Sequence, residues 1–377
     1  MIPVTKPFFP PIEEYQKYLK GVWERQCLTN DGPLVQELEK KLAGYLDLKK
    51  GLYLSNGTIA LQIAIKALGL KNEVITTPFS YVATTSAAVW EGLKPVFVDI
   101  DPGTFNIDPG KIECAITNKT TGIIATHVFG NPCDVETIEK IAAKYNLKLI
   151  YDAAHCFGTT YKSRSIYEYG DISTTSFHAT KLFSTLEGGA VFTNDEELYQ
   201  KMSLLRNFGH DGHDQFSGVG INGKNSELHA AMGLSVLKYA DQILEKRKQQ
   251  IDYYNKYLNH GLVHSQSVDS HTNWNGSFYP IVFGREEVAF RVKEYLERNE
   301  IFPRRYFYPS LNKLDYVDSG RMPISESIAE RILCLPLYHD LTENEIKKIS
   351  DLVNRAVSPF ESYRLKKKSD VYPDVIL

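Results

Sequence analysis

The sequence predicts an α/β protein with a mostly parallel central sheet, helices on both faces of that sheet, and a smaller C-terminal α+β domain. From about residue 50 onward, short runs of β-branched and apolar residues alternate with longer segments of helical periodicity. Strands that alternate with helices are typical of βαβ crossovers, which place consecutive strands parallel in one sheet. Runs that are apolar at nearly every position, such as PVFVDI (95–100), are expected of strands that helices cover on both faces.

Five runs in this region are predicted strands, and two of the intervening segments are predicted helices. The segment TIALQIAIKAL (58–68) repeats apolar residues at helical spacing, and DVETIEKIAAKY (134–145) does the same after Asp134, which suits a helix N-cap. The predicted strands are EVITTPF (73–79), PVFVDI (95–100), TGIIATHVFG (121–130), KLIYDAA (148–154) and ISTTSFH (172–178).

A change in the pattern of predicted elements near residue 255 predicts a domain boundary. The chain has 377 residues, which is long enough for two or three domains. A long amphipathic helical stretch covers residues 226–258, and shorter mixed elements such as NWNGSFYPIVF and RRYFYPSL follow it. We therefore predict a large domain over residues 1–255, which includes the N-terminal segment, and a small domain over residues 256–377.

Composition and charge argue against several classes of protein. The 43 Lys+Arg and 46 Asp+Glu residues give a formal charge of −3, so a nucleic-acid partner is not expected. The first residues contain prolines and charges instead of an apolar signal segment, and no apolar run approaches the length of a membrane span. The five cysteines form no CxxC pair, which argues against a disulfide framework or a zinc ribbon. We expect a cytoplasmic protein with no membrane association.

One glycine pattern imitates a dinucleotide-binding motif. Gly218, Gly220 and Gly223 spell GxGxxG, which would favour a nicotinamide-dependent oxidoreductase. That motif must follow a buried strand, whereas the polar loop GHDGHDQFSG precedes it here. The context therefore disfavours nicotinamide binding.

The same loop contains a cluster of residue types that bind divalent metals. His210, Asp211, His213 and Asp214 form an H-D-x-H-D pattern. These residues lie among glycines, without an apolar framework that would fix the direction of each ligand. We interpret the cluster as hydrated surface and expect no metal.

Two separate segments supply an anion site and a carboxylate at the ends of strands. In LYLSNGTIAL (52–61) a predicted strand ends and a helix begins at Ser55 to Thr58, where unpaired N–H groups attract anions and Gly57 admits a phosphate close to the backbone. In LIYDAAHCFG (149–158) Asp152 follows an apolar strand, at the sheet edge where open α/β sheets bind ligands. The alternatives are a plain N-cap and a structural salt-bridge partner.

A third segment adds an amine at the same predicted edge. In STTSFHATKLFSTLEGGAV (173–191), Lys181 follows a strand end and precedes the Gly188-Gly189 turn. A lysine in such a loop is otherwise a solvated charge. Pyridoxal 5′-phosphate requires these three groups together: an amine for covalent attachment of its aldehyde, a carboxylate for its pyridine nitrogen and a helix start for its phosphate.

At the level of whole motifs, the sequence resembles the sugar-nucleotide aminotransferases of the fold-type I pyridoxal phosphate class over almost the entire chain. Within that family, IPVTKPFFPP, LTNDGP and GINGKN are similar to enzymes that make dTDP-4-amino-4,6-dideoxyglucose. Leu186 departs from the family pattern, because many members have glycine before the Glu-Gly-Gly turn. The matching stretches are SNGTIAL, TPFSYVATTSAA, PVFVDIDPGTFNID, YDAAHCFG, SFHATK, LRNFGHDG, GINGKNSELHAAMGL and RRYFYPSL.

The resemblance implies roles for the residues around the cofactor ring. Lys181 would carry the cofactor and then act as the base that moves a proton, and Asp152 would pair with the ring nitrogen. Tyr81 would lie over the ring, although a helix aromatic of the core is the alternative. His155 would pack beside the ring on the face opposite Tyr81.

The resemblance also implies a phosphate site shared between two subunits. Gly57, Thr58 and Ser176 would hold the phosphate through N–H and hydroxyl groups. Asn222 resembles the asparagine that the neighbouring subunit contributes to the same phosphate in this family. A homodimer with two composite active sites is therefore expected.

The substrate expected from the resemblance is a nucleotide-linked keto sugar, with L-glutamate as the amino donor. Tyr306 and Tyr308, with Arg304 or Arg305, resemble the family's RxYYP segment, where a guanidinium pairs with diphosphate oxygens; surface arginines are the alternative. The expected reaction aminates C4 of a dTDP-4-keto-6-deoxyglucose for lipopolysaccharide or O-antigen glycans. Amination at C3 of a 3-keto isomer is the alternative within the family.

Overall fold

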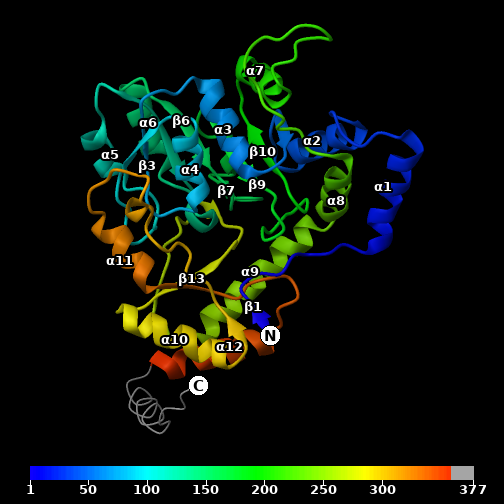
Figure 1. Cartoon of the computed structure of the whole chain (residues 1–377). Helices are drawn as coiled ribbons and strands as arrows, with labels where there is room; N and C mark the ends of the chain where they lie inside the picture. The colour runs from blue at the N-terminus through cyan, green and yellow to red at the C-terminus, as the bar shows by residue number, and fades with distance from the viewer. Residues whose placement is uncertain (358–377) are drawn as a thin grey trace, which may run out of the picture.

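The computed structural model describes residues 1–357, and its centre is a seven-stranded mixed sheet (Figure 1). β10 runs antiparallel to both of its neighbours, and every other neighbouring pair of strands is parallel. The prediction of a mostly parallel sheet is confirmed. The strands lie in the order β2 (Gly51–Leu54), β10 (Gly189–Phe192), β9 (Ile172–Ser176), β6 (Lys148–Asp152), β5 (Thr120–Thr126), β3 (Glu73–Thr76) and β4 (Lys94–Phe97).

Helices bury both faces of this sheet, as the apolar strands predicted. Along β6, Leu149 and Tyr151 belong to one apolar cluster, whereas Ile150 belongs to another on the opposite face. This alternation follows from the two-residue period of a strand. The first face packs against α2 (Pro33–Tyr45), α6 (Val135–Lys144) and α8 (Glu227–Leu237), and the second against α3 (Gly57–Leu68), α4 (Val82–Trp90) and α7 (Glu196–Arg206).

Two of the helices begin where the capping residues predict. The side chain of Asn56 accepts a hydrogen bond from the N–H of Ile59 at 2.9 Å, and Asp134 accepts from the N–H of Thr137 at 3.1 Å. Such caps satisfy N–H groups that have no acceptor within the helix. Because α3 directly follows β2, the Asn56 cap fixes the first turn of α3 next to the carboxyl ends of the strands.

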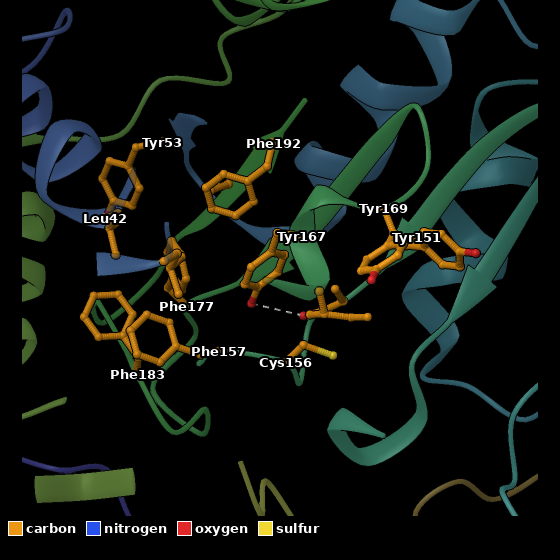
Figure 2. Packing of buried hydrophobic residues seen from close by; sticks show 14 of the residues in the cluster. Leu42, Tyr53, Tyr151, Cys156, Phe157, Tyr167, Tyr169, Phe177, Phe183 and Phe192 are labelled. Carbon is orange, nitrogen blue, oxygen red and sulfur yellow. Dashed lines mark hydrogen bonds between the residues drawn. The ribbon is translucent and has the colours of Figure 1, made fainter. Parts of the chain in front are cut away.

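Aromatic residues on the first face anchor the loop that follows β9 (Figure 2). Phe157 and Phe183 stack with ring centroids 4.4 Å apart, and Phe177 meets Phe183 edge-on at 5.0 Å. Phe177 also pairs with Gly188 and Thr185 through its backbone, at 2.7 and 2.9 Å. Both ends of the loop between Phe177 and Phe183 are therefore held by the core.

The C-terminal part has its own core, and α9 (Ala240–Tyr257) connects the two. Its three-stranded sheet contains β11 (His264–Ser265), β13 (Tyr279–Val282) and β15 (Ile332–Leu335), and α10 (Glu286–Arg298) and α12 (Glu343–Val357) pack beside it. The predicted boundary at residue 255 falls inside α9, whose Tyr254 belongs to the C-terminal core. The predicted helical stretch 226–258 is two helices, α8 and α9, separated at residues 238–239.

The first residues of the chain lie against the C-terminal part, whereas the following helix at residues 12–25 packs on α8 of the large part. β1 (Ile2–Pro3) pairs in parallel with β14 (Ile301–Phe302), a contact between residues about 300 positions apart that no local pattern indicates. The remaining elements are α1 (Ile12–Arg25), α5 (Pro109–Ala115), α11 (Pro323–Arg331), β7 (Thr160–Tyr161), β8 (Arg164–Ser165), β12 (Thr272–Asn273), and 3₁₀ turns at Val128–Gly130, Ile166–Glu168 and Leu311–Lys313. No helix within residues 1–357 has both the length and the apolar character needed to cross a membrane.

A buried carboxylate links the two parts of the chain. Asp99, just after β4, accepts hydrogen bonds from the N–H groups of Ile324 and Ser325 at 2.9 and 2.8 Å, and from the Ser325 hydroxyl at 2.6 Å. Asp99 thereby caps α11, a helix of the C-terminal part. A carboxylate in this position compensates the positive end of the helix and the orphaned N–H groups together.

We expect Asp99→Ala to lower the apparent free energy of unfolding by about 2 kcal/mol, because it removes a cap and leaves buried N–H groups without an acceptor. Urea unfolding followed by circular dichroism measures the change. Asp318→Ala, at a fully exposed carboxylate, is the control and should leave the unfolding midpoint unchanged. Equal midpoints for the two variants would contradict the structural role of Asp99.

Candidate active site

The carboxyl ends of the parallel strands and the start of α3 surround a cavity of about 350 Å³. Asp152 ends β6, Ser176 ends β9 and Thr126 ends β5, so three adjacent strands direct residues toward the same edge. The structure brings together most of the predicted site residues at this cavity. Its wall includes Gly57, Thr58, Tyr81, Asp152, His155, Ser176, Lys181, Arg304 and Tyr306, and also Asn56, Ser80, Thr126, His178, Glu187, Phe278 and Phe307.

One corner of the cavity combines a helix start with a strand end. Asn56 satisfies the N–H of Ile59, but the first N–H groups of a helix, here those of Gly57 and Thr58, have no acceptor within it. A Cβ atom on Gly57 would lie 2.9 Å from Cβ of Ser176, so only glycine permits α3 to begin this close to β9. The Asn56 cap therefore leaves the N–H groups of Gly57 and Thr58 available for an anion.

Lys181 and Asp152 form the electrostatic centre of the site. Removal from water lowers the pKa of the Lys181 amine to about 8, although the charge of Asp152 opposes this shift. Burial raises the pKa of Asp152, against the effects of hydrogen bonds from Thr84 and the Ala154 N–H and of the charge of Lys181. Desolvation disfavours a charge, and an opposite charge nearby favours it, so each group helps to keep the other ionised.

Hydroxyl groups that the sequence reading did not include surround the Asp152 carboxylate. The Thr84 hydroxyl donates to Oδ2 of Asp152 at 2.6 Å, and the Ser80 hydroxyl lies 2.7 Å from that of Thr84. Thr126, whose Cα is the register partner of Asp152 across β5 and β6, lies within hydrogen-bond distance of Ser80 at 3.1 Å. The four-residue spacing of Ser80 and Thr84 around the start of a helix is a signal that could have identified them.

His155 is held by residues of the C-terminal part. Its carbonyl accepts hydrogen bonds from Nδ2 of Asn275 at 2.7 Å and from the hydroxyl of Ser277. Its ring meets Phe278 edge-on at 4.9 Å and stacks near Phe307 at 5.9 Å. Burial lowers the pKa of the His155 ring, so its uncharged form is favoured.

The loop after Lys181 forms the rim of the cavity. Nε2 of His178 lies 3.5 Å from Oε1 of Glu187, and both side chains line the cavity. Leu186, the predicted departure from the family pattern, has φ of +68° and an exposed side chain. The left-handed conformation explains why glycine suits this position, and leucine occupies it at some conformational cost.

The structure separates the two adjacent arginines. Arg304 and Tyr306 line the cavity, and no carboxylate among residues 1–357 pairs with Arg304. Arg305 points elsewhere: it donates to Glu286 at 3.0 Å and to the carbonyl of Glu330 at 2.8 Å, and it covers the ring of Tyr308 at 3.6 Å. Arg305 and Tyr308 therefore lie outside the cavity wall of the described chain.

Asn222 also lies away from the cavity of its own chain. It is exposed in the loop between α7 and α8, which extends away from the rest of the molecule (Figure 1) and is pinned at its base by an Asn207–Asn222 bridge. Gly218, Gly220 and Gly223 belong to this loop, which follows a helix and not a strand, so the context of a dinucleotide motif is not present. His210, Asp211, His213 and Asp214 lie there too, and no group of three possible metal ligands occurs within the described part of the chain.

The cavity brings together an amine, a carboxylate at a strand end and a helix start, on a mostly parallel sheet of this order. Together these features define a fold-type I pyridoxal phosphate enzyme. A model of the DegT/DnrJ/EryC1/StrS aminotransferase family matches residues 11–354. The chain therefore belongs to this family and is a pyridoxal phosphate-dependent aminotransferase.

Relatives and solved structures agree with this assignment. A dTDP-4-amino-4,6-dideoxy-D-glucose transaminase of Shigella dysenteriae is 44% identical, over 92% of this chain and 96% of the relative. A dTDP-3-amino-3,6-dideoxy-alpha-D-galactopyranose transaminase of Aneurinibacillus thermoaerophilus is 34% identical, over 91% and 95%. A crystal structure of DesI in the presence of its TDP-sugar product superposes with a TM-score of 0.91 at 31% identity, over 97% of this chain and 95% of that one.

The residues present fit the cofactor. The corner that only a glycine at position 57 allows is lined by N–H groups and a hydroxyl, the donors that a phosphate requires. Lys181 and Asp152 lie on the same cavity wall and influence each other's pKa, as an aldehyde-binding amine and a pyridinium partner must.

We expect the rate at which the cofactor-free enzyme captures pyridoxal phosphate to rise with pH, with its midpoint near pH 8. The neutral amine of Lys181 is the nucleophile, and its fraction increases as the pH passes its pKa. Asp152→Asn should move the midpoint to lower pH, because loss of the carboxylate charge lowers the pKa of Lys181 further. Stopped-flow absorbance measures the rate, with Lys181→Ala as the control for capture by other lysines. A wild-type midpoint near 10.5, the ordinary value for lysine, would contradict the desolvated site.

Proposed function

We propose that this aminotransferase moves the amino group of L-glutamate to C4 of a nucleotide-linked 4-keto-6-deoxy sugar, with dTDP-4-keto-6-deoxyglucose as the substrate. The observation that carries the proposal is the cavity itself, which combines Lys181 and Asp152 with Arg304, a guanidinium that pairs with no carboxylate within residues 1–357. The name of the Shigella dysenteriae relative and the TDP-sugar product of DesI support the choice of substrate. The product would be an amino sugar nucleotide for lipopolysaccharide or O-antigen glycans.

Each residue at the centre has a defined task in this proposal. Bound pyridoxal phosphate supplies an aldehyde carbon conjugated to an electron-accepting ring. Nζ of Lys181, with a pKa near 8, takes the proton from the α-carbon of the amino donor and returns it in the exchange. Asp152 holds a proton on the ring nitrogen by charge attraction. Tyr81 and His155 would hold the ring between them, and Gly57, Thr58 and Ser176 would bind the phosphate.

The sugar nucleotide would bind at the side of the cavity that the C-terminal part closes. Arg304 is the guanidinium available there for the diphosphate, because Arg305 is occupied by Glu286 and by the ring of Tyr308. Tyr306, whose ring lies 5.6 Å from the Arg304 guanidinium, would limit the direction of that side chain. Of the two arginines, Arg304 is thereby assigned to the diphosphate. Tyr308 contributes to substrate binding only indirectly.

The active form in this proposal is a homodimer with two composite sites. Asn222 is exposed on the projecting loop, together with the apolar side chains of Phe216, Val219 and Ile221. A neighbouring subunit would cover these side chains and receive Asn222 at its phosphate corner. The five free thiols fit a reducing compartment such as the cytoplasm, where we place the reaction.

Amination at C3 of a 3-keto-6-deoxy sugar is the second candidate. The relative from Aneurinibacillus thermoaerophilus, named as a 3-amino sugar transaminase, favours it. Both reactions would use the same residues around the cofactor.

A product assay tests the proposed reaction. We expect enzyme, 15N-labelled L-glutamate and dTDP-4-keto-6-deoxyglucose to yield 2-oxoglutarate and a labelled amino sugar nucleotide in equal amounts. Because Lys181 supplies the amine and the base, Lys181→Ala should lower turnover roughly a thousandfold or more. Nuclear magnetic resonance of the product locates the label at C4; a label at C3 from the 3-keto isomer alone would favour the second candidate, and no transfer from glutamate to either sugar would refute both.

Mixing two inactive variants tests the composite site. Asn222→Asp places a negative charge near the phosphate, and Lys181→Ala removes the amine, so each variant alone should be nearly inactive. If the two residues meet across a subunit interface, unfolding the variants together and refolding them should restore about a quarter of the wild-type activity, since half of the dimers then contain one intact site. No recovery, in a mixture shown by mass spectrometry to contain mixed dimers, would place Asn222 outside the partner's site.

A further inference from the structure

Three buried hydroxyl groups form a continuous chain that ends on Asp152. Oγ1 of Thr84 lies 2.6 Å from Oδ2 of Asp152, Oγ of Ser80 lies 2.7 Å from Oγ1 of Thr84, and Oγ1 of Thr126 lies 3.1 Å from Oγ of Ser80. All three side chains are buried. Ser80 precedes α4 and Thr84 lies within it, four residues later, so their contact is local. The tertiary fold brings this pair to Thr126 at the end of β5 and to Asp152 at the end of β6.

The number of hydroxyl protons fixes the direction of each hydrogen bond in this series of hydroxyl groups. An ionised carboxylate only accepts hydrogen bonds, so the single proton of the Thr84 hydroxyl must point to Asp152. Thr84 can then only accept from Ser80, and Ser80 in turn can only accept from Thr126. Every hydroxyl dipole in the chain therefore points its positive end toward the carboxylate, and aligned hydrogen bonds strengthen one another.

The alternative for hydroxyls in a first helical turn is local capping. Ser and Thr side chains at such positions commonly bond to the backbone of their own helix. Here α4 has no side-chain cap, its N-cap residue is Tyr81, and the Thr84 proton goes to a strand 68 residues away in sequence. The three hydroxyls are thus used across elements and not to start the helix.

We propose that Thr126, Ser80 and Thr84 form a directed hydroxyl chain that holds Asp152 ionised and oriented, and thereby keeps a proton on the ring nitrogen of bound pyridoxal phosphate. The inference rests on the role of Asp152 in the proposed function. The three residues are positioning residues, because they act on the ring nitrogen through Asp152.

The hydroxyl chain offsets an effect of the burial of Asp152. Burial raises the pKa of this carboxyl, whereas a hydrogen bond to the ionised form lowers it. His155, His178, Glu187 and Arg304 line the same cavity, but within residues 1–357 Lys181 is the charged group whose field lowers the pKa of Asp152. When Lys181 is neutral, the hydroxyl chain and the N–H of Ala154 at 3.2 Å are the remaining groups within residues 1–357 that stabilise the carboxylate.

The test compares variants that differ by one hydroxyl on the same helix. Thr84→Val removes the donor and keeps the side-chain shape, and Thr84→Ser returns the donor. Thr85→Val is the matched control, because Thr85 is the next residue of α4, is buried, and has a hydroxyl with no partner among residues 1–357. The probe is the holoenzyme loaded with pyridoxal phosphate that is 15N-labelled in its ring, and the 15N chemical shift reports whether the ring nitrogen is protonated.

We expect Thr84→Val to shift the ring nitrogen toward its unprotonated value, with about a tenfold change in the proton equilibrium, which is the usual size for a hydrogen bond to a charged group. Thr84→Ser should recover most of the wild-type shift, and Thr85→Val should match wild type. Ser80→Ala should act in the same direction as Thr84→Val by a smaller amount, because it removes only the polarising neighbour.

Two further measurements separate the possible failures. If Asp152→Asn changes the ring nitrogen but Thr84→Val matches Thr85→Val, the hydroxyl chain is refuted while the role of Asp152 stands. If Asp152→Asn also leaves the ring nitrogen unchanged, the proposed role of Asp152 fails first. Should Thr84→Val not retain the cofactor, 13C-carboxyl titration of Asp152 in the cofactor-free protein replaces the ring signal, and an unchanged pKa there overturns the proposal.

Discussion

The site depends on the cost of keeping a carboxylate and an amine out of water beside each other. Desolvation alone would neutralise both Asp152 and Lys181, and their mutual attraction offsets that effect only because two strand ends and one anchored loop hold them at one cavity. The sheet order therefore has a chemical consequence: β6 and β9 must be neighbours for Asp152 and the segment after Ser176 to meet. The buried aromatic residues that flank the lysine loop serve the same end, since a mobile loop would expose the amine to water.

The sequence was informative wherever a function depends on the end of a regular element. Asp152 and Ser176 follow apolar strand runs, Asn56 precedes a periodic helix, and parallel strands place such residues at one edge, so the sheet and the centre of the site could be predicted together. The choice between Arg304 and Arg305 could not be made this way. They lie in an irregular segment, and only packing shows that Arg305 is held by Glu286 and stacked on Tyr308.

Contacts that depend on how several strands and helices are paired also could not be predicted from local sequence patterns. Thr126 faces Asp152 because β5 and β6 pair at that position, and Ser80 reaches Thr126 only because α4 begins at the same edge. The pairing of β1 with β14 is a similar case, because two residues at the N-terminus carry too little pattern to identify a partner about 300 positions away. Propensity describes segments one at a time, whereas these contacts are properties of the assembled sheet.

The long helix α9 has a consequence for how the chain melts. Near its start Ile243 is part of the core beneath the main sheet, and near its end Tyr254 is part of the C-terminal core, while Gln250 donates to the carbonyls of Tyr338 and Leu341 at 2.7 and 2.8 Å. One helix thus has an end in each of the two hydrophobic cores. Heat that disorders one interior would strip apolar surface from the other, so the two halves are coupled into one cooperative transition and do not come apart as independent units.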